Sequence, residues 1–137
     1  MAMSLNPLTG KFDSDTKAFA LPGSNLLAVV TDVSDEVCFT TISPITGFIT
    51  GITCLLSGDF TSGTMTFRPH VAGTPPGGGA LDLAFTGGAG DLDKNVAISP
   101  TAAYAVTTGQ QIGVAITRAT VVAPGGFEAQ YSLIVSN

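Results

Sequence analysis

Apolar and polar residues alternate along short stretches of this chain, and clusters rich in glycine and proline separate those stretches. Residues 64–71 place Met65, Phe67 and Val71 on one face of an extended strand and mainly polar side chains on the other. Such a period of two residues indicates a β-strand with one buried face. No segment shows the 3.6-residue period of an amphipathic helix, so the chain is expected to fold almost entirely as β-structure.

The same alternation predicts several further strands. On the opposite face of residues 111–122, Gly113 and Ala115 indicate that another backbone packs closely against the strand. Weaker candidates are residues 25–33, 36–42, 48–56 and 95–99. The residues predicted to point inward are Leu81, Leu83 and Phe85 in residues 81–85, Ile112, Val114 and Ile116 in residues 111–122, and Phe127, Ala129, Tyr131, Leu133 and Val135 in residues 127–135.

About eight strands, separated by turn signals roughly ten residues apart, predict an all-β, antiparallel β-sandwich. A parallel sheet would need helical crossovers, for which the sequence shows no pattern. A jelly roll fits this strand count, and an immunoglobulin-like sandwich is the competitor, although the tryptophan of its signature is missing. Pro69 cannot donate a ladder hydrogen bond, which predicts that the strand 64–71 lies at an edge or bulges there.

Charged residues are scarce, making up 11 % of the 137 residues against roughly 25 % in an average soluble domain. The net charge of -5 leaves no excess of cations to attract nucleic acid or an anionic membrane, so neither is an expected partner. Mean hydropathy is +0.44, yet no uninterrupted apolar run approaches the ~20 residues of a membrane-spanning helix. A single domain with so few surface charges is expected to have protein neighbours that cover it.

The first residues of the chain differ from the rest. Residues 1–36 hold seven of the fifteen charged residues, and residues 1–22 show neither strand alternation nor a helical period. We therefore predict an extended N-terminal arm over residues 1–22 and a β-sandwich domain over residues 23–137. The start of the chain shows no secretory signal, which favours synthesis in the cytoplasm. The arm carries apolar residues that are expected to contact neighbouring subunits: Leu5, Leu8, Phe12, Phe19 and Leu21.

The sequence offers no catalytic, cofactor-binding or metal-binding constellation. His70 is the single histidine, and it is expected on the exposed face of its strand with no second histidine or cysteine nearby in sequence. Asp91 and Asp93 miss the spacing of a glycine-rich calcium repeat by one residue, which favours a solvated turn. The chain is therefore expected not to be an enzyme and to hold neither cofactor nor metal.

Two states are open for the pair of cysteines, Cys38 and Cys54. If residues 36–42 and 48–56 form a hairpin, the two cysteines lie opposite each other and the geometry allows a cross-strand disulfide. Both cysteines lie among apolar residues, and without a secretion signal two buried free thiols are favoured.

Four stretches resemble small all-β proteins encoded among the head genes of tailed bacteriophages: residues 47–52, LLSGDFTSGTMTFRPHVAG, ISPTAAYAVTTGQQIGVAIT and the closing FEAQYSLIVS. Those proteins are decoration, or cement, proteins that bind the outside of the capsid. The resemblance covers about residues 47–136. It implies a homotrimer at or near threefold positions of an icosahedral shell, with an N-terminal segment that reaches over subunits of the major capsid protein.

The residues themselves favour an assembly component, because a nearly uncharged body and an apolar arm suit a protein that is covered by neighbours. An alternative is a receptor- or carbohydrate-binding jelly roll of a phage tail fibre or head fibre. Such a domain would normally expose aromatic platforms, and only Tyr104 and Tyr131 could serve beside the phenylalanines. A cupin-like enzyme is a weaker alternative, because one histidine cannot supply its metal ligands.

Overall fold

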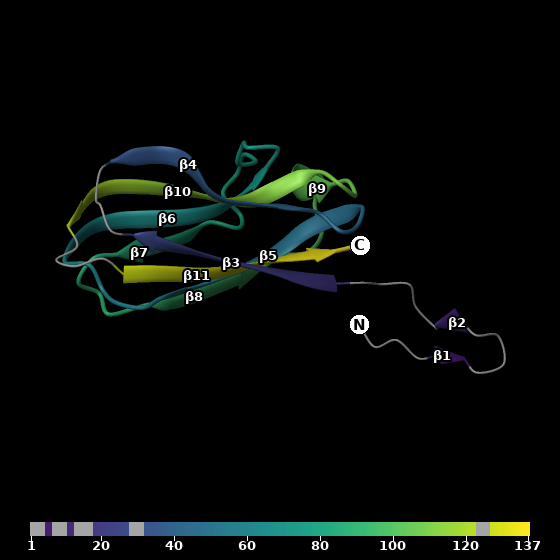
Figure 1. Cartoon of the computed structure of the whole chain (residues 1–137), viewed down its shortest axis with the longest axis horizontal. Coiled ribbons are helices and arrows are strands. Elements are labelled where there is room, and N and C mark those ends of the chain that lie inside the picture. The colour runs from purple at the N-terminus through teal and green to yellow at the C-terminus, as the bar shows by residue number, and fades with distance from the viewer. Residues whose placement is uncertain (1–4, 7–10, 13–17, 28–31, 123–126) are drawn as a thin grey trace.

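The computed structural model describes residues 5–6, 11–12, 18–27, 32–122 and 127–137. Residues 18–137 form two antiparallel β-sheets that face each other and one short 3₁₀ helix over the part described, and residues 5–6 and 11–12 form a separate two-stranded sheet (Figure 1). None of the described helical segments has the length and apolar character needed to cross a membrane. The elements are β1 (Leu5–Asn6), β2 (Lys11–Phe12), β3 (Ala18–Leu27), β4 (Val33–Ile42), β5 (Gly47–Leu56), β6 (Ser62–Val71), β7 (Leu83–Thr86), β8 (Asp93–Ala97), η1 (Ala102–Tyr104), β9 (Ala105–Val106), β10 (Gln111–Val122) and β11 (Phe127–Ser136).

Successive strands alternate between the two sheets. The four-stranded sheet has the order β4-β10-β6-β7, and the five-stranded sheet has the order β3-β11-β5-β8 with β9 paired to β5. Leaving out the two-residue strands, each strand is followed by one of the other sheet, except that β6 is followed by β7. This order is that of a jelly roll. The predicted antiparallel jelly-roll sandwich of about eight strands is therefore confirmed, and the immunoglobulin-like strand order is not adopted.

The inward faces of the sheets share one apolar core. Ile52 on β5 and Phe67 on β6 are fully buried, and Phe67 packs edge-on against Phe85 with the ring centroids 5.7 Å apart. Of the other residues predicted to point inward, Val71 is half-buried, the side chain of Phe127 lies outside the described set, and the rest are buried. The period of two thus identified the core correctly, because successive side chains of a strand point to opposite faces.

Strand β3 corrects the predicted boundary between arm and sandwich. It begins at Ala18 and pairs with β11 over all of its ten residues. Residues 18–22, which were predicted to belong to the arm, are therefore part of the five-stranded sheet. Pro22 and Gly23 suggested a break, but β3 lies at the edge of its sheet, where proline is tolerated because one side of the strand has no ladder to complete.

Pro69 lies where β6 has a neighbour on one side only. Although β6 is an interior strand, β7 pairs only with residues 64–67. At Pro69 the strand pairs with Val114 of β10 and with no residue of β7. The predicted edge is therefore confirmed for the second half of β6.

The predicted hairpin between residues 36–42 and 48–56 is wrong. These segments lie in β4 and β5, which belong to different sheets, and the connection 43–46 crosses from one sheet to the other. A short turn between two apolar strands serves either arrangement, so residue spacing alone could not distinguish them. Cys38 and Cys54 are free thiols.

Candidate interaction surfaces

His70 is buried on the outer face of the four-stranded sheet, where we predicted an exposed side chain. It is 1 % exposed, and its Nε2 lies 3.0 Å from the carbonyl oxygen of Phe39 on β4. Its Nδ1 accepts a hydrogen bond of 3.1 Å from the N–H of Gly73. These two partners fix the neutral tautomer with its proton on Nε2. Burial lowers the pKa of His70 below the ordinary 6.5, so the imidazole is uncharged at neutral pH. Its two hydrogen bonds link β4 to the turn after β6.

Gly113 makes room for this imidazole. On β10 it lies between Thr40 of β4 and His70 of β6, and an added Cβ would collide with the carbonyl group of Phe39 and lie 2.6 Å from His70 Nε2. The imidazole therefore lies across the backbone of β10, in the space that a side chain would fill. In the sequence, the sign of this contact was Gly113, a glycine predicted to face outward, together with His70, the single histidine, on another predicted strand.

Arg68 connects three segments of the same face. Its guanidinium lies 3.1 Å from the carboxylate of Asp35 on β4 and 3.1 Å from that of Asp82 in the β6–β7 connection. The backbone N–H of Asp35 donates to Thr117 Oγ1, and the Thr117 hydroxyl donates to the Asp35 carboxylate. The charged side chains at the centre of this face are thus paired within the chain, whereas the exposed Thr40 and Thr64 make no side-chain hydrogen bond to another described residue.

The other two cations of the described sandwich also lie beside carboxylates. Lys94 Nζ is 3.0 Å from Asp91, and the Arg118 guanidinium is 3.8 Å from Glu36. Asp91 thus pairs with a lysine of β8, and within the described residues no group of three or more His, Cys, Asp or Glu side chains could hold a metal ion. Each cation of the described sandwich already has an acidic partner, which leaves little attraction for an anionic ligand.

Cys38 and Cys54 lie near Tyr131, between the sheets. The Tyr131 hydroxyl lies 3.7 Å from Cys38 Sγ, and the Cys38 thiol donates to the carbonyl of Val114 at 3.3 Å. Burial raises the pKa of Cys54 to about 12 and also raises the pKa values of Cys38 and Tyr131. All three groups therefore stay protonated at neutral pH, and neither thiol is an effective nucleophile.

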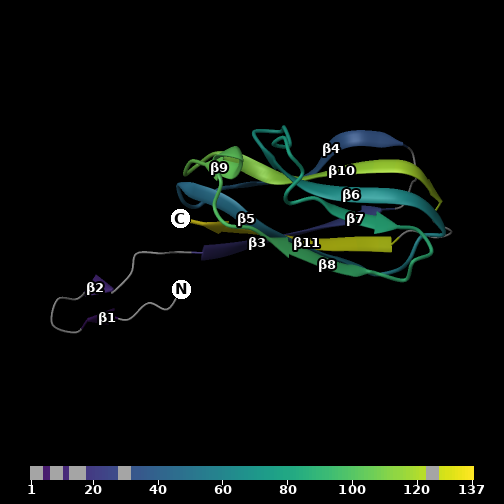
Figure 2. The ribbon, with the colours of Figure 1, turned by 180° about the vertical axis from the view of Figure 1, so that it is seen from behind.

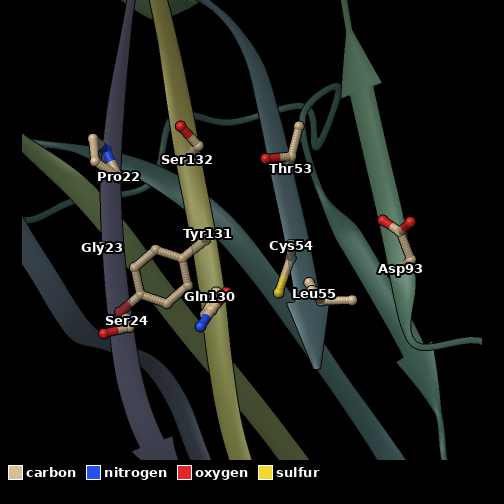
Figure 3. A pocket seen from close by; sticks show the side chains of 10 residues that line it. All are labelled: Pro22, Gly23, Ser24, Thr53, Cys54, Leu55, Asp93, Gln130, Tyr131 and Ser132. Atoms are coloured by element: carbon tan, nitrogen blue, oxygen red, sulfur yellow. The ribbon is translucent and has the colours of Figure 1, made fainter. Parts of the chain in front are cut away.

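The outer face of the five-stranded sheet borders a shallow groove of about 500 Å³ (Figure 3). Leu55 is 49 % exposed there, and Asp93 is the one charged residue among those that line the groove. The hydroxyl groups of Ser24, Thr53 and Ser132 make no hydrogen bond to another described residue. This face therefore offers hydrogen-bonding groups and apolar surface to a partner. Its two central cross-strand rows are Ser24–Gln130–Leu55–Asp93 and Pro22–Ser132–Thr53–Asn95.

The residues predicted to contact partners fall into two groups. Leu5 on β1 pairs with Phe12 on β2. Both strands lie beyond the start of β3, away from the sandwich (Figures 1 and 2). The side chains of Leu5 and Phe12, and the whole of Leu8, lie outside the described part of the chain. Leu21 and Phe19 lie in β3 itself. Leu21 packs against the core of its own sandwich, whereas Phe19 is 38 % exposed. Leu21 is partly buried, so Phe19 is the more exposed of the two, and contact with neighbouring subunits stays a prediction for both.

No protein-family model matches this chain, and no curated protein is significantly similar to it. Among solved structures it is similar to VP2 of the infectious bursal disease virus subviral particle, with a TM-score of 0.55 and 13 % identity over 99 % of this chain and 37 % of that one. A chain of the cyanophage Pam1 capsid asymmetric unit gives a TM-score of 0.48 and 13 % identity over 88 % of this chain and 85 % of that one. The chain spans little more than a third of the VP2 chain that it matches, and at this identity the likeness shows a shared fold.

Proposed function

We propose that this chain is a non-enzymatic structural protein of a virus particle, a capsid decoration or cement protein. It binds the outer surface of the shell as a homotrimer and stabilises the shell, and its N-terminal segment contacts neighbouring subunits. Its partners are other copies of itself and the major capsid protein, and it is made in the host cytoplasm. The observation that carries the proposal is the outer face of the five-stranded sheet, where Asp93 is the one charged residue lining the groove and the hydroxyl groups of Ser24, Thr53 and Ser132 have no partner among the described residues.

The size of this face fits a contact that also needs the N-terminal segment. Strands of about ten residues, spaced about 4.8 Å apart, give a face of roughly 30 by 15 Å. A specific interface buries about 800 Å² on each partner, so the sheet face alone is too small. Three copies around an axis could each cover a neighbour's face, with the N-terminal segment supplying the remaining contact area.

The fold likeness to VP2 supports the same proposal. VP2 is a protein of a subviral particle, and its match to this chain extends over nearly the whole jelly roll. A jelly roll serves many functions, so this likeness supports the class of protein and does not identify the partner.

Decoration can be tested with shells prepared without this protein. The full chain should sediment with the shells and raise the temperature at which they open. Removing residues 1–17 should leave the sandwich folded, because β3 begins at Ala18, and should abolish sedimentation with the shells. A control lacking only residues 1–4 retains β1 and β2 and should still bind. Failure of the full chain to bind would contradict decoration, and normal binding without residues 1–17 would contradict the role of the N-terminal segment.

Carbohydrate binding is the second candidate, and the groove on the five-stranded sheet is the observation that favours it. Its volume lies within the range of roughly 300–1,000 Å³ that is typical of ligand pockets. Hydroxyl and amide side chains beside the exposed Leu55 could bind an uncharged saccharide. A glycan array should then show a clear ligand whose binding is lost in Gln130→Ala, whereas an array without binding would remove this alternative.

A further inference from the structure

The acidic residues of the sandwich gather toward one of its two ends. We call this the acidic end; it consists of the connections 57–61 and 87–92 with the strand halves that adjoin them. Of the eight acidic residues between positions 32 and 128, three lie near the middle of the four-stranded sheet: Asp35 and Asp82, which both bond to Arg68, and Glu36, which shares a cross-strand row with Leu83. The five that lie at or near the acidic end are Asp32, Asp59, Asp91, Asp93 and Glu128.

The opposite end, which we call the arm end, includes the connections 43–46, 98–104 and 107–110. None of these three connections contains a charged residue; the connection 72–82, which also begins at this end, carries Asp82, whose carboxylate is paired with Arg68. Figures 1 and 2 show β9, the C-terminus and the start of β3 at this end, with β1 and β2 beyond it. Strand β3 therefore begins at the arm end.

Hydrogen bonds join two of the arm-end connections to each other. The N–H of Ser43 donates to the carbonyl of Gln110, and the N–H of Gly109 donates to the carbonyl of Ser43, each at 2.9 Å. The N–H of Thr108 donates to Thr46 Oγ1 at 3.1 Å. Loops held in this way lose little conformational entropy when they dock, which suits a contact surface.

We propose that the arm end sits on the protein surface of the shell and that the acidic end faces solvent, an inference that rests on the decoration function proposed above. The N-terminal segment and the arm-end connections leave the same end, so both would reach the same partner. Ile42, which ends β4 at this end, is 51 % exposed, and Pro44 and Thr46 beside it are exposed as well. Apolar and hydroxyl side chains without charges fit an uncharged protein surface.

The acidic end is unsuited to the same contact. Five carboxylates buried against a shell would lose water without gaining cations of this chain as new partners. Facing outward they remain hydrated, and they repel other decorated particles. The connections of the arm end carry no cation, Lys11 of β2 lies beyond this end, and the net charge of -5 gives the chain no excess of cations for an anionic lipid or a nucleic acid.

Two matched substitutions test this orientation. Ala103 in η1 is exposed at the arm end, and Ala89 in the connection 87–92 is exposed at the acidic end, so Ala103→Glu and Ala89→Glu add the same charge to opposite ends. Sedimentation with shells prepared without this protein is the readout. We expect Ala103→Glu to weaken binding at least tenfold and Ala89→Glu to bind like the unaltered chain. Ala102→Glu, the neighbouring exposed position, replaces Ala103→Glu if circular dichroism shows that the latter is misfolded.

Three outcomes would overturn the orientation. Equal binding of both variants would show that the arm end is not the contact, and selective loss in Ala89→Glu would reverse the orientation. Binding to uncharged phosphatidylcholine vesicles, lost in Ala103→Glu while shell binding is kept, would assign the arm end to a lipid surface. If the unaltered chain fails to bind shells, the decoration function itself is contradicted, and the orientation falls with it.

Discussion

The outer faces of the two sheets differ in where their polar groups find partners. On the four-stranded sheet, His70 bonds to β4 and to the following turn, and Arg68 bonds to two carboxylates of the same chain. On the five-stranded sheet, Ser24 and Thr53 have no side-chain hydrogen bond to another described residue. The first face holds a buried imidazole and a paired guanidinium that link its segments. The second has the side-chain hydrogen bonds Thr50–Ser136 and Gln130–Glu128, and its remaining hydroxyl groups are available to a neighbour. Substitutions on the first face should therefore reduce stability, and substitutions on the second should reduce association.

The largest expected loss of stability comes from filling the space under His70. Gly113→Ala places a methyl group against the carbonyl of Phe39, which is backbone and cannot move aside, so the free energy of unfolding should fall by about 3 kcal/mol. Gly51→Ala is the control on the five-stranded sheet. Its added methyl group would lie 3.2 Å from Ile134 Cγ1 and 3.3 Å from the carbonyl oxygen of Val96, which need to move by only a few tenths of an ångström, so it should cost no more than about 1 kcal/mol. Urea denaturation measures the free energy of unfolding of both variants. Equal losses of stability in the two would contradict the tighter packing beside Gly113.

Removing the His70 imidazole should have the next largest effect. His70→Gln leaves the carbonyl of Phe39 or the N–H of Gly73 without its partner, which should lower the free energy of unfolding by about 2 kcal/mol at pH 7.5.

The same residue makes stability depend on pH. Because the pKa of His70 is lowered in the folded state, the unfolded chain takes up the proton first, with a pKa near 6.5. The stability of the unaltered protein should therefore be full above about pH 6.5 and should fall as pH is lowered from there through the folded pKa. The His70→Gln variant should lack this component when unfolding is measured between pH 7.5 and 5, and an identical pH profile would exclude His70 as its source.

The smallest expected effect concerns the reactivity of the two thiols, Cys38 and Cys54, which lie between the sheets. With the pKa of Cys54 at about 12, roughly one molecule in ten thousand carries its thiolate at pH 8. Iodoacetamide should therefore leave Cys54 unlabelled in the native protein and label both thiols in denaturant, as measured by intact mass. Cys38 is half-buried and should react before Cys54 if labelling of the folded protein is prolonged. Absence of labelling in denaturant would indicate a disulfide instead.

Alternation of apolar and polar residues was enough to predict most of the strands, their inward faces and the jelly roll, because each strand buries one face in the same core. It did not predict the first half of β3, which was assigned to the arm. The sheet in which each strand lies was not predictable in this way. The hairpin expected around residues 43–46 shows the reason: pairing is decided by contacts between residues far apart in sequence, such as Gln111 with Ile42.

The positions of His70 and Leu21 in the sandwich could not be predicted from the sequence for a related reason. The period of two places His70 outward, and it does lie on the outward face, but only the absence of a side chain at Gly113 on the neighbouring strand explains its burial. Leu21 was assigned to the arm because Pro22 follows it, and only the pairing of β3 with β11 shows that Leu21 reaches the core. Charge scarcity was visible in the sequence, whereas the concentration of acidic residues at one end emerges only when the strands are assembled.

The mass of the protein in solution tests most directly whether neighbours cover the five-stranded sheet. Thr53 and Thr64 are exposed threonines on the outer faces of the five-stranded and four-stranded sheets, so Thr53→Arg and Thr64→Arg form a matched pair. Light scattering at micromolar concentration should give three times the 13.8 kDa chain mass for the unaltered protein and for Thr64→Arg, and the single-chain mass for Thr53→Arg. A monomeric unaltered protein, or a trimer that survives Thr53→Arg and dissociates in Thr64→Arg, would contradict the account.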